Sequence, residues 1–264
     1  MKILCLGWSY TGRYLSANFP EQEVFFLSRR SADLETRGFL SHKENDSSDS
    51  HTYDLILDCV PPEKEELPNR SVVESLLSQR KIPYVHISAT SVFGENSGEE
   101  EELLVFDELS AVCPSDEKGE ARVKRELMVR EVYGARIVRS TGIYGPGRCL
   151  ALQFQSGNFE RARSGNRMVS RIHVHDLCRL ILAVSSQEKP LLHAVDTKPS
   201  SNLETFVYLE ELLGISVPGN WRDQRVEGRI IRSRYALPIL SIYRFPTYRE
   251  GFRDCLLRMG DKSR

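Results

Sequence analysis

An apolar strand that runs straight into a glycine-bearing turn is the feature that most constrains this chain. Residues 3–6, Ile-Leu-Cys-Leu, form a short apolar run of the kind that fills a buried parallel strand. Gly7, Ser9 and Gly12 follow it with the spacing G-x-S-x-x-G, and we expect a helix to begin near Thr11 and Gly12. Strand, turn and helix in this order form the opening of a βαβ unit.

This turn resembles a known arrangement for binding a dinucleotide. In a G-x-G-x-x-G turn, the glycines permit a tight bend and let backbone N–H groups approach the pyrophosphate, which lies at the positive end of the helix dipole. Here Ser9 replaces the middle glycine, and its hydroxyl is able to donate to a phosphate. An ordinary glycine-bearing turn is the alternative. The position directly after a first strand favours a dinucleotide, with these predicted contacts: Gly7, Trp8, Ser9, Tyr10, Thr11 and Gly12.

Composition limits the class of protein. The chain has 264 residues, which fits one large α/β domain or one domain with a modest C-terminal lobe. A formal net charge of −1 argues against a general nucleic-acid binder. No apolar run approaches the roughly 20 residues of a membrane helix, and no signal peptide precedes the first strand. We therefore expect a cytoplasmic protein that binds neither nucleic acid nor membrane; its oligomeric state stays open.

Six cysteines are scattered along the chain without a C-x-x-C pair or a Cys/His cluster. This usage predicts reduced thiols and no metal site. Cys5, Cys59 and Cys178 lie in apolar segments and are expected to act as small buried hydrophobic residues.

Strands and helices alternate along the whole chain. Buried strands are expected at 23–27, 53–60, 82–88, 135–139 and 172–174, and helices at 70–80, 116–130, 177–184 and 202–213. In the second of these helices Ala121 and Leu127 are expected to face inward, and Asp176 is expected to cap the third. The alternation predicts a doubly wound parallel sheet.

Two strand ends are expected to contact the cofactor beyond the opening turn. The second strand ends at Ser28, Arg29 and Arg30, where an NAD site usually places an acidic residue for the ribose 2′-hydroxyl. Guanidinium groups suit a 2′-phosphate instead, so we predict a preference for NADP(H), with NAD as the alternative. The alternative role for both arginines is that they are only solvated. The strand that ends at Cys59, Val60 and Pro61 is expected to pass near the cofactor in a doubly wound sheet.

Three stretches together resemble the extended and atypical short-chain dehydrogenases/reductases, the clan of NAD-dependent epimerases and dehydratases. They are the opening turn, the strand end at residues 86–94 (HISATSVFG), and residues 137–148 (IVRSTGIYGPGR) followed by 171–176 (RIHVHD). Residues 245–252 (FPTYREGF) are similar to endings in the YeeZ-like branch. The resemblance implies one unit over 1–264: a Rossmann-type doubly wound sheet, mainly residues 1–147, and a small C-terminal substrate lobe, mainly 148–264, with a returning strand and helix near 171–184.

The same resemblance exposes substitutions at the clan's catalytic positions. The chemistry of the clan uses a Tyr as proton donor or acceptor, a Lys four residues later, and a Ser or Thr that holds the substrate oxygen. Here these positions carry Lys118, Arg122 and Ala89. Arg122 is still able to hold a ribose hydroxyl or a phosphate, and we count it with Ser88 among the cofactor contacts. Candidate replacements for the missing acid are Ser88, Thr90, Lys118 and Tyr144. A packed aromatic is the alternative role for Tyr144.

Substrate contacts are expected from the second half of the chain. Arg148 and Arg171 fall where related enzymes contact a substrate phosphate or nucleotide, which indicates an anionic small molecule. The alternative for Arg171 is a structural ion pair. His173 and His175 lack a third ligand, so we assign no metal and place His173 on the substrate side.

The residues leave three functions open. The first is an NADP(H)-dependent oxidoreductase or epimerase with an altered acid, acting on a small or nucleotide-linked substrate. The second is a cofactor-binding sensor or partner-binding protein without turnover, which the substitutions at Ala89, Lys118 and Arg122 favour. The third is a Rossmann-type protein that has lost its cofactor, which Ser9 leaves open.

Overall fold

The computed structural model describes residues 1–28, 52–62, 70–94, 103–187, 190–236 and 243–260. These form two compact units, each assembled from three stretches of chain. The first unit comprises residues 1–92, 112–139 and 180–192, and the second comprises 93–111, 140–179 and 193–264. The sequence pattern divides the chain by function, with the cofactor bound mainly by residues 1–147 and the substrate mainly by residues 148–264. That division stays a prediction. No helix in the described ranges is long and apolar enough to cross a membrane.

A six-stranded sheet forms the centre of the first unit, in the order β10-β6-β4-β3-β1-β2. The pairs that β1 makes with β2 and β3, and that β3 makes with β4, are parallel. The inner strands are buried along most of their length because both faces of a parallel sheet are covered. The strands are β1 (Lys2–Leu6), β2 (Glu23–Leu27), β3 (Leu55–Asp58), β4 (Tyr84–Ala89), β6 (Arg136–Ser140) and β10 (Leu191–Ala194).

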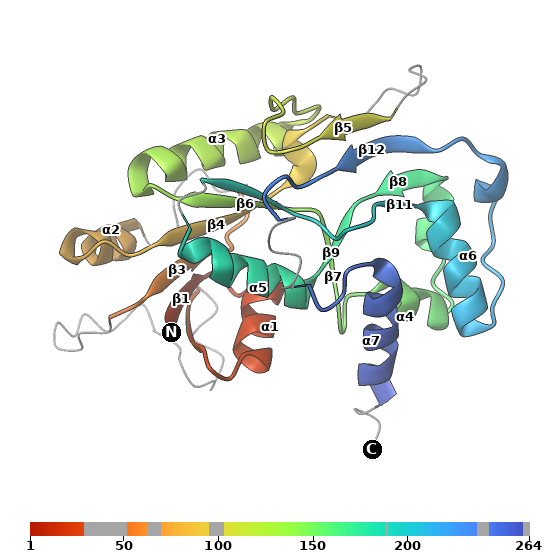
Figure 1. Ribbon diagram of the computed structural model, residues 1–264, viewed down its shortest axis with the longest axis horizontal. Helices are drawn as coiled ribbons and strands as arrows, with labels where there is room; N and C mark the ends of the chain where they lie inside the picture. The colour runs from red at the N-terminus through yellow and green to blue at the C-terminus, as the bar shows by residue number, and fades with distance from the viewer. Residues whose placement is uncertain (29–51, 63–69, 95–102, 188–189, 237–242, 261–264) are drawn as a thin grey trace. The chain divides into compact units, whose positions relative to one another are not determined.

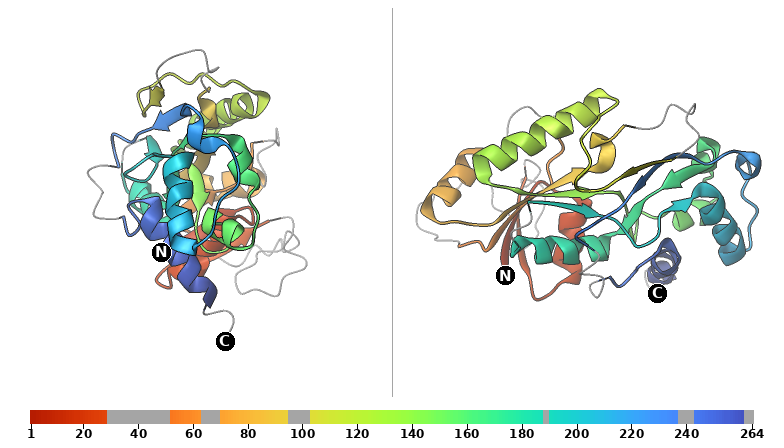
Figure 2. Two further views of the ribbon diagram at one scale, coloured as in Figure 1. Left: turned by 90° about the vertical axis from the view of Figure 1, so that its right-hand side faces the viewer. Right: turned by 45° about the horizontal axis from the view of Figure 1, so that its top comes forward.

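Helices cover both faces of this sheet. In the right-hand view of Figure 2, α2 and α3 lie on one face, and α1 and α5 lie on the other. This arrangement confirms the predicted α/β, Rossmann-type doubly wound sheet. The helices are α1 (Tyr10–Asn18), α2 (Arg70–Gln79), α3 (Glu117–Tyr133) and α5 (Val174–Ser185), with a short 3-10 helix η2 (Thr90–Val92) after β4.

The strand order reverses between β1 and β3. From β1 the chain first adds β2 on one side and then continues with β3, β4, β6 and β10 on the other (Figure 1). In open α/β sheets, ligands bind outside the carboxyl ends of the strands at such a reversal. The residues that follow β1 and β3 therefore flank the expected binding crevice of this unit.

Two expectations about helix faces and caps are wrong. Leu127 on α3 is 51% exposed, whereas Glu126 and Arg125 are buried. Glu126 faces inward because its carboxylate accepts hydrogen bonds from the Arg139 guanidinium, at 2.7 Å from Nη2. Asp176 does not cap a helix: α5 begins at Val174, and the Asp176 carboxylate accepts the backbone N–H groups of Arg244 and Phe245 instead.

The second unit combines small sheets with three further helices. One sheet has the order β11-β8-β12-β5, and a parallel pair is formed by β7 and β9. An aromatic core that includes Trp221, Phe206 and Phe252 holds α4, α6 and α7 together. The elements are β5 (Leu104–Phe106), β7 (Gly142–Tyr144), α4 (Leu150–Gln155), η3 (Glu160–Ser164), β8 (Arg167–Val169), β9 (Arg171–His173), β11 (Ser200–Ser201), α6 (Asn202–Leu213), η4 (Trp221–Asp223), β12 (Glu227–Ile231) and α7 (Tyr248–Gly260).

Candidate functional site

The turn after β1 has the backbone geometry that a dinucleotide-binding turn needs. Gly7 has φ +88°, a backbone conformation that residues with a side chain rarely adopt. Ser9 is the N-cap of α1, and its Oγ accepts the N–H of Gly12 at 2.9 Å. Helix α1 therefore begins at Tyr10, slightly earlier than expected.

Close packing around the turn explains its second glycine. A Cβ placed on Gly12 would lie 2.6 Å from Cys5 Sγ and 3.0 Å from Phe26 Cε1. Helix α1 thus rests directly on β1 and β2, which is the role of the last glycine in the dinucleotide motif. A Cβ on Gly7 would approach Val60 Cγ2 at 3.4 Å, so the turn after β1 lies against the turn after β3. The structure brings these two predicted cofactor contacts together.

The other residues of the opening turn surround this point. Trp8 is half-buried, and its ring meets Phe26 edge-on at 4.7 Å between centroids. Tyr10 is half-buried, and Thr11 is buried at the start of α1. Ser28, directly after β2, is half-buried. Arg29 and Arg30, on which the preference for NADP(H) depends, lie outside the described residues.

A buried acid at the end of β3 holds the turn at residues 59–61. The Asp58 carboxylate accepts the Val60 N–H at 2.9 Å and the Tyr84 hydroxyl at 3.0 Å, and it lies 2.8 Å from His86 Nδ1. Burial alone would raise the pKa of Asp58, but the contacts with His86, Val60 and Tyr84 outweigh it and lower the pKa. Asp58 is therefore an ionised, fully hydrogen-bonded support for the second wall of the crevice.

The catalytic candidates of the first unit occupy different environments. Ser88 is buried near the end of β4, and Thr90 is half-buried in η2. Lys118 is exposed, whereas Arg122 one turn later is half-buried. A Cβ on Gly119 would lie 2.4 Å from the Ser91 carbonyl oxygen, so the start of α3 packs closely on η2.

A pocket of about 500 Å³ lies within the second unit. Both predicted substrate arginines line it: Arg148 is exposed and Arg171 is buried. Arg161 and Arg167 line it as well, and the described lining residues include no aspartate or glutamate. Guanidinium groups form paired hydrogen bonds with phosphate and carboxylate oxygens, so such groups of a ligand would suit this wall of the pocket.

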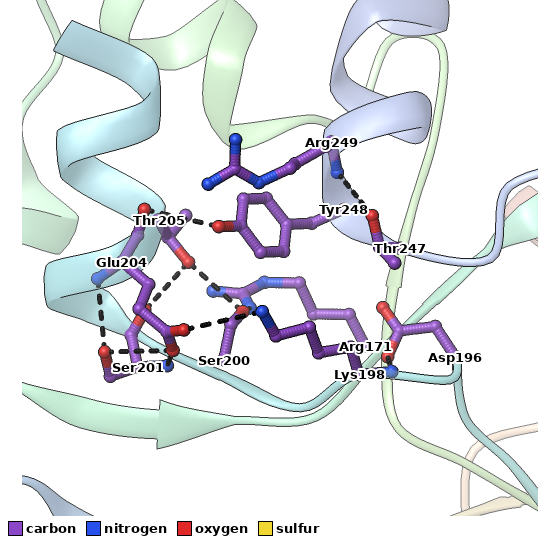
Figure 3. A network of polar contacts seen from close by, with 10 residues as sticks. All are labelled: Arg171, Asp196, Lys198, Ser200, Ser201, Glu204, Thr205, Thr247, Tyr248 and Arg249. Carbon is purple, nitrogen blue, oxygen red and sulfur yellow. Dashed lines mark hydrogen bonds and ion pairs between the residues drawn. The ribbon is translucent and has the colours of Figure 1, made fainter. Parts of the chain in front are cut away.

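Arg171 is held by a polar network at one side of this pocket (Figure 3). Its Nη1 donates to Ser200 Oγ at 2.6 Å and to the Val169 carbonyl oxygen at 3.3 Å. The Tyr248 ring lies between the guanidinium groups of Arg171 and Arg249, at 5.7 and 5.8 Å from its centroid. The described contacts of Arg171 are with hydroxyl, carbonyl and aromatic groups. They do not include the alternative, a direct ion pair with a carboxylate.

Asp196 lies near Arg171 and follows β10. Burial raises the pKa of its carboxyl to about 8, although the positive charge of Arg171 and the hydrogen bond from the Lys198 N–H oppose this change. The carboxyl is therefore largely protonated at neutral pH. It also lines a second, more apolar cavity of about 340 Å³ in the same unit.

His173 and Tyr144 are packing partners in the second unit. The His173 ring is fully buried, and its Nδ1 accepts the N–H of His175 at 3.2 Å. Burial lowers the pKa of His173 to about 3, so the ring is neutral. Tyr144 meets it edge-on at 5.2 Å, and its hydroxyl donates to the Thr247 carbonyl oxygen at 3.3 Å. Burial raises the pKa of Tyr144, which makes its hydroxyl a weaker acid than that of an exposed tyrosine.

Sequence reasoning missed several residues of these sites. The sequence pattern places Asp58 within an apolar strand and predicts no role for Asp196. Both come directly after or at the end of a buried strand, a position that was a usable signal because strand ends line binding crevices. Arg161, Arg167 and Ser200 carry no such signal, since only the folding of the second unit brings them to Arg171 or to its pocket.

Comparison with known proteins identifies the fold. No protein-family model and no curated sequence matches the chain. Solved structures match this chain almost end to end. One of them is a functionally unknown conserved protein from Silicibacter pomeroyi, which is 21% identical, with 97% of this chain and 98% of that chain covered and a TM-score of 0.75. The structure of a putative NAD-dependent epimerase/dehydratase from Methylobacillus flagellatus is 22% identical over 98% of both chains, also with a TM-score of 0.75. MoeE5 in complex with UDP-glucose and NAD is 18% identical over the full length of both chains, with a TM-score of 0.69.

Proposed function

We propose that this chain is an NAD(P)-binding oxidoreductase or epimerase-like protein of the short-chain dehydrogenase/reductase type. It acts on a small or nucleotide-linked anionic substrate, and NADP(H) is its preferred cofactor. The observation that carries the proposal is the turn at Gly7–Gly12, which lies at the reversal of strand order. A protein with the same fold, MoeE5, has been solved with UDP-glucose and NAD, which supports both ligand classes.

The cofactor would be held by backbone more than by side chains. The N–H groups at the start of α1 and the Ser9 hydroxyl would bind the pyrophosphate. Val60, positioned by Asp58, would form the opposite wall, and Ser28 with Arg29 and Arg30 would contact the adenosine ribose. A bound nicotinamide supplies a hydride donor or acceptor; the chain supplies orientation and a proton.

The proton donor would differ from the usual tyrosine. A hydride step at a carbonyl or alcohol carbon needs a group that gives or takes a proton at the neighbouring oxygen. Thr90 at the start of η2 is the favoured replacement, because it is half-buried, whereas Lys118 is exposed. Ser88 and Tyr144 are the other candidates, and the buried, hydrogen-bonded hydroxyl of Tyr144 favours a packing role.

The pocket of the second unit would bind the anionic part of the substrate. Arg148 and Arg171 would pair with its phosphate or carboxylate oxygens, and His173 would support the wall through Tyr144. Guanidinium groups form paired hydrogen bonds with such oxygens, which gives direction as well as charge.

A second function has its own supporting observation. Ala89 ends β4 without a hydroxyl, and Lys118 is exposed, so the usual catalytic residues are missing from the described structure. A cofactor-binding sensor or partner-binding protein without turnover is consistent with this loss.

One experiment tests the proposal and separates the two functions. The purified protein is titrated with NADPH while energy transfer from tryptophan to the reduced nicotinamide is recorded, and a panel of nucleotide-linked sugars is then added. An oxidoreductase should bind NADPH and oxidise it in the presence of one substrate, whereas an epimerase should convert one sugar into its epimer with no net change of the cofactor. A sensor should bind NADPH and leave both the cofactor and every sugar unchanged. Absence of binding would contradict both functions.

A further inference from the structure

A chain of buried hydroxyl groups leads away from Arg171 (Figure 3). The Arg171 Nη1 donates to Ser200 Oγ at 2.6 Å, and Ser200 Oγ lies 3.3 Å from Thr205 Oγ1. Thr205 Oγ1 in turn donates to the Ser201 carbonyl oxygen at 2.9 Å. Ser200 and Thr205 are both 0% exposed, so these bonds form out of contact with solvent. The first turn of α6 is therefore connected to the Arg171 side chain through two hydroxyl groups.

The number of available protons sets the direction of this chain. A serine or threonine hydroxyl donates one hydrogen bond. Thr205 uses its single proton for the Ser201 carbonyl oxygen, so it accepts in its contact with Ser200. The Ser200 proton therefore points at Thr205, and a lone pair of Ser200 Oγ faces Arg171, which only donates. Ser200 is thus fixed as an acceptor for the guanidinium.

The same contacts leave one edge of the Arg171 guanidinium for a ligand. Nη1 carries two N–H bonds and has two acceptors, Ser200 Oγ and the Val169 carbonyl oxygen at 3.3 Å. Nε and Nη2 make no hydrogen bond with any residue in the described part of the chain. Arg171 lines the pocket and is 8% exposed, so the Nε–Nη2 edge is what remains for a ligand there.

Such an edge selects a ligand by shape as well as by charge. Its two N–H bonds are parallel, and they match two oxygens carried by one phosphorus or carbon atom. A lysine would offer a point charge without this geometry. The match depends on orientation, because a guanidinium that rotates freely presents this pair of N–H bonds only part of the time.

We propose that Ser200 and Thr205 are positioning residues, which hold the Nε–Nη2 edge of Arg171 in place for two-point binding of a phosphate or carboxylate group. This role rests on the proposed function, in which the anionic part of the substrate binds at Arg171, and it adds the residues that set the geometry of that contact. Neither residue belongs to the described lining of the pocket, so both act through Arg171.

The first measurement needs no ligand. Nuclear magnetic resonance of the isotope-labelled full chain records the guanidinium signals of Arg171, which are assigned by their absence in Arg171→Lys. A locked guanidinium gives separate signals for its two Nη groups, whereas rotation averages them. The wild type should give separate signals, and Ser200→Ala should average them. Averaged signals in the wild type would overturn the proposal.

Calorimetry with uridine monophosphate, which carries one terminal phosphate, tests the effect on binding. Ser200→Ala should weaken binding about ten-fold, because it removes an acceptor of Nη1, and Thr205→Val about three-fold, because it removes only the group that orients Ser200. The control is Ser185→Ala, which removes a buried hydroxyl that donates to the Leu182 carbonyl oxygen at 2.7 Å and should bind as the wild type does. Wild-type affinity in both test variants would contradict the positioning role.

Thr205→Ser separates positioning from packing. Valine keeps the shape of threonine and loses the hydroxyl, whereas serine keeps the hydroxyl and loses a buried methyl group. Positioning predicts that Thr205→Ser binds uridine monophosphate as the wild type does, although its thermal stability is lower. Weaker binding by Thr205→Ser than by Thr205→Val would assign Thr205 to packing and overturn the proposal.

The two measurements also keep the positioning role apart from the proposed function. Separate guanidinium signals in a wild type that does not bind uridine monophosphate would contradict the anion site of the proposed function, and two-point binding would fall with it. Binding of uridine monophosphate with averaged signals would support the anion site and overturn the positioning role alone.

Discussion

The sulfur of Cys5 fills the space that a side chain at position 12 would need. A Cβ on Gly12 would lie 2.6 Å from Cys5 Sγ, far closer than two such atoms normally approach. Because of this contact, α1 lies directly against β1, and the N–H groups at the start of the helix are held at the end of the strand. The turn at residues 7–12 is thus built by packing beneath it as much as by the freedom of its glycines.

Gly12→Ala is expected to lower the free energy of unfolding by about 1–3 kcal/mol, because the added methyl group overpacks this contact. Cys5→Ala in the same chain should recover part of the loss, since it removes the colliding sulfur. Urea unfolding of the two single variants and the double variant measures the coupling. Additive effects would show that the contact does not explain Gly12.

Asp58→Ala is expected to lower the free energy of unfolding by about 2–4 kcal/mol, because the Val60 N–H, the Tyr84 hydroxyl and His86 lose a buried acceptor. It should also weaken NADPH binding, since the turn at Val60 loses its support. The matched control is Asp54→Ala, whose carboxylate accepts one exposed N–H, from Lys2. Equal losses in the two variants would contradict the role of Asp58.

The raised pKa of Asp196 predicts a dependence of stability on pH. Between its ordinary pKa of 3.8 and its folded value of about 8, the folded chain binds more protons at this carboxyl than the unfolded chain. The free energy of unfolding should therefore fall as pH rises through this range, by up to about 1.4 kcal/mol per pH unit from this group.

Asp196→Asn should remove that contribution, so the variant gains stability over the wild type progressively from pH 4 to pH 8. Urea unfolding at several pH values measures the difference, and Asp223→Asn, at an exposed position, is the control. Parallel curves for wild type and Asp196→Asn would show that Asp196 ionises normally in the folded chain.

Arg148→Gln is expected to weaken the binding of UDP by about ten-fold, which corresponds to the loss of one charged hydrogen-bonding partner. Its thermal stability should change little, because Arg148 is exposed. Arg253→Gln makes the same change in charge at an exposed position that does not line the pocket, and it should bind UDP as the wild type does. Calorimetry on both variants tests this, and equal losses would indicate only a long-range effect of charge.

Local sequence was sufficient for the strands of the first unit. The apolar runs that become β1, β2, β3 and β4 are buried on both sides, and few other structures accommodate such runs next to glycine turns. The resemblance to the clan's motifs added the expected fold, and the structure confirms it. The helix ends also followed local chemistry, as with Gly214, which ends α6 with φ +64°.

Long-range polar contacts explain what the sequence could not show. Asp176 has the residue type of a helix cap, yet its carboxylate binds N–H groups near residue 245, far along the chain. Leu127 fits an apolar pattern, but the ion pair between Glu126 and Arg139 decides which face of α3 turns inward. The arginines of the pocket were only partly predicted for the same reason, because tertiary packing brings Arg161 and Arg167 beside Arg148.

Calorimetric titration of the purified chain with NADPH and NADH tests the central claim most directly. The account predicts tight binding of NADPH and weaker binding of NADH, with the preference lost in a variant that carries both Arg29→Ala and Arg30→Ala. Equal affinities would contradict the preference for NADP(H) but would still support dinucleotide binding at the turn. If neither cofactor binds, the turn at Gly7–Gly12 is not a dinucleotide site, and the proposed function is wrong.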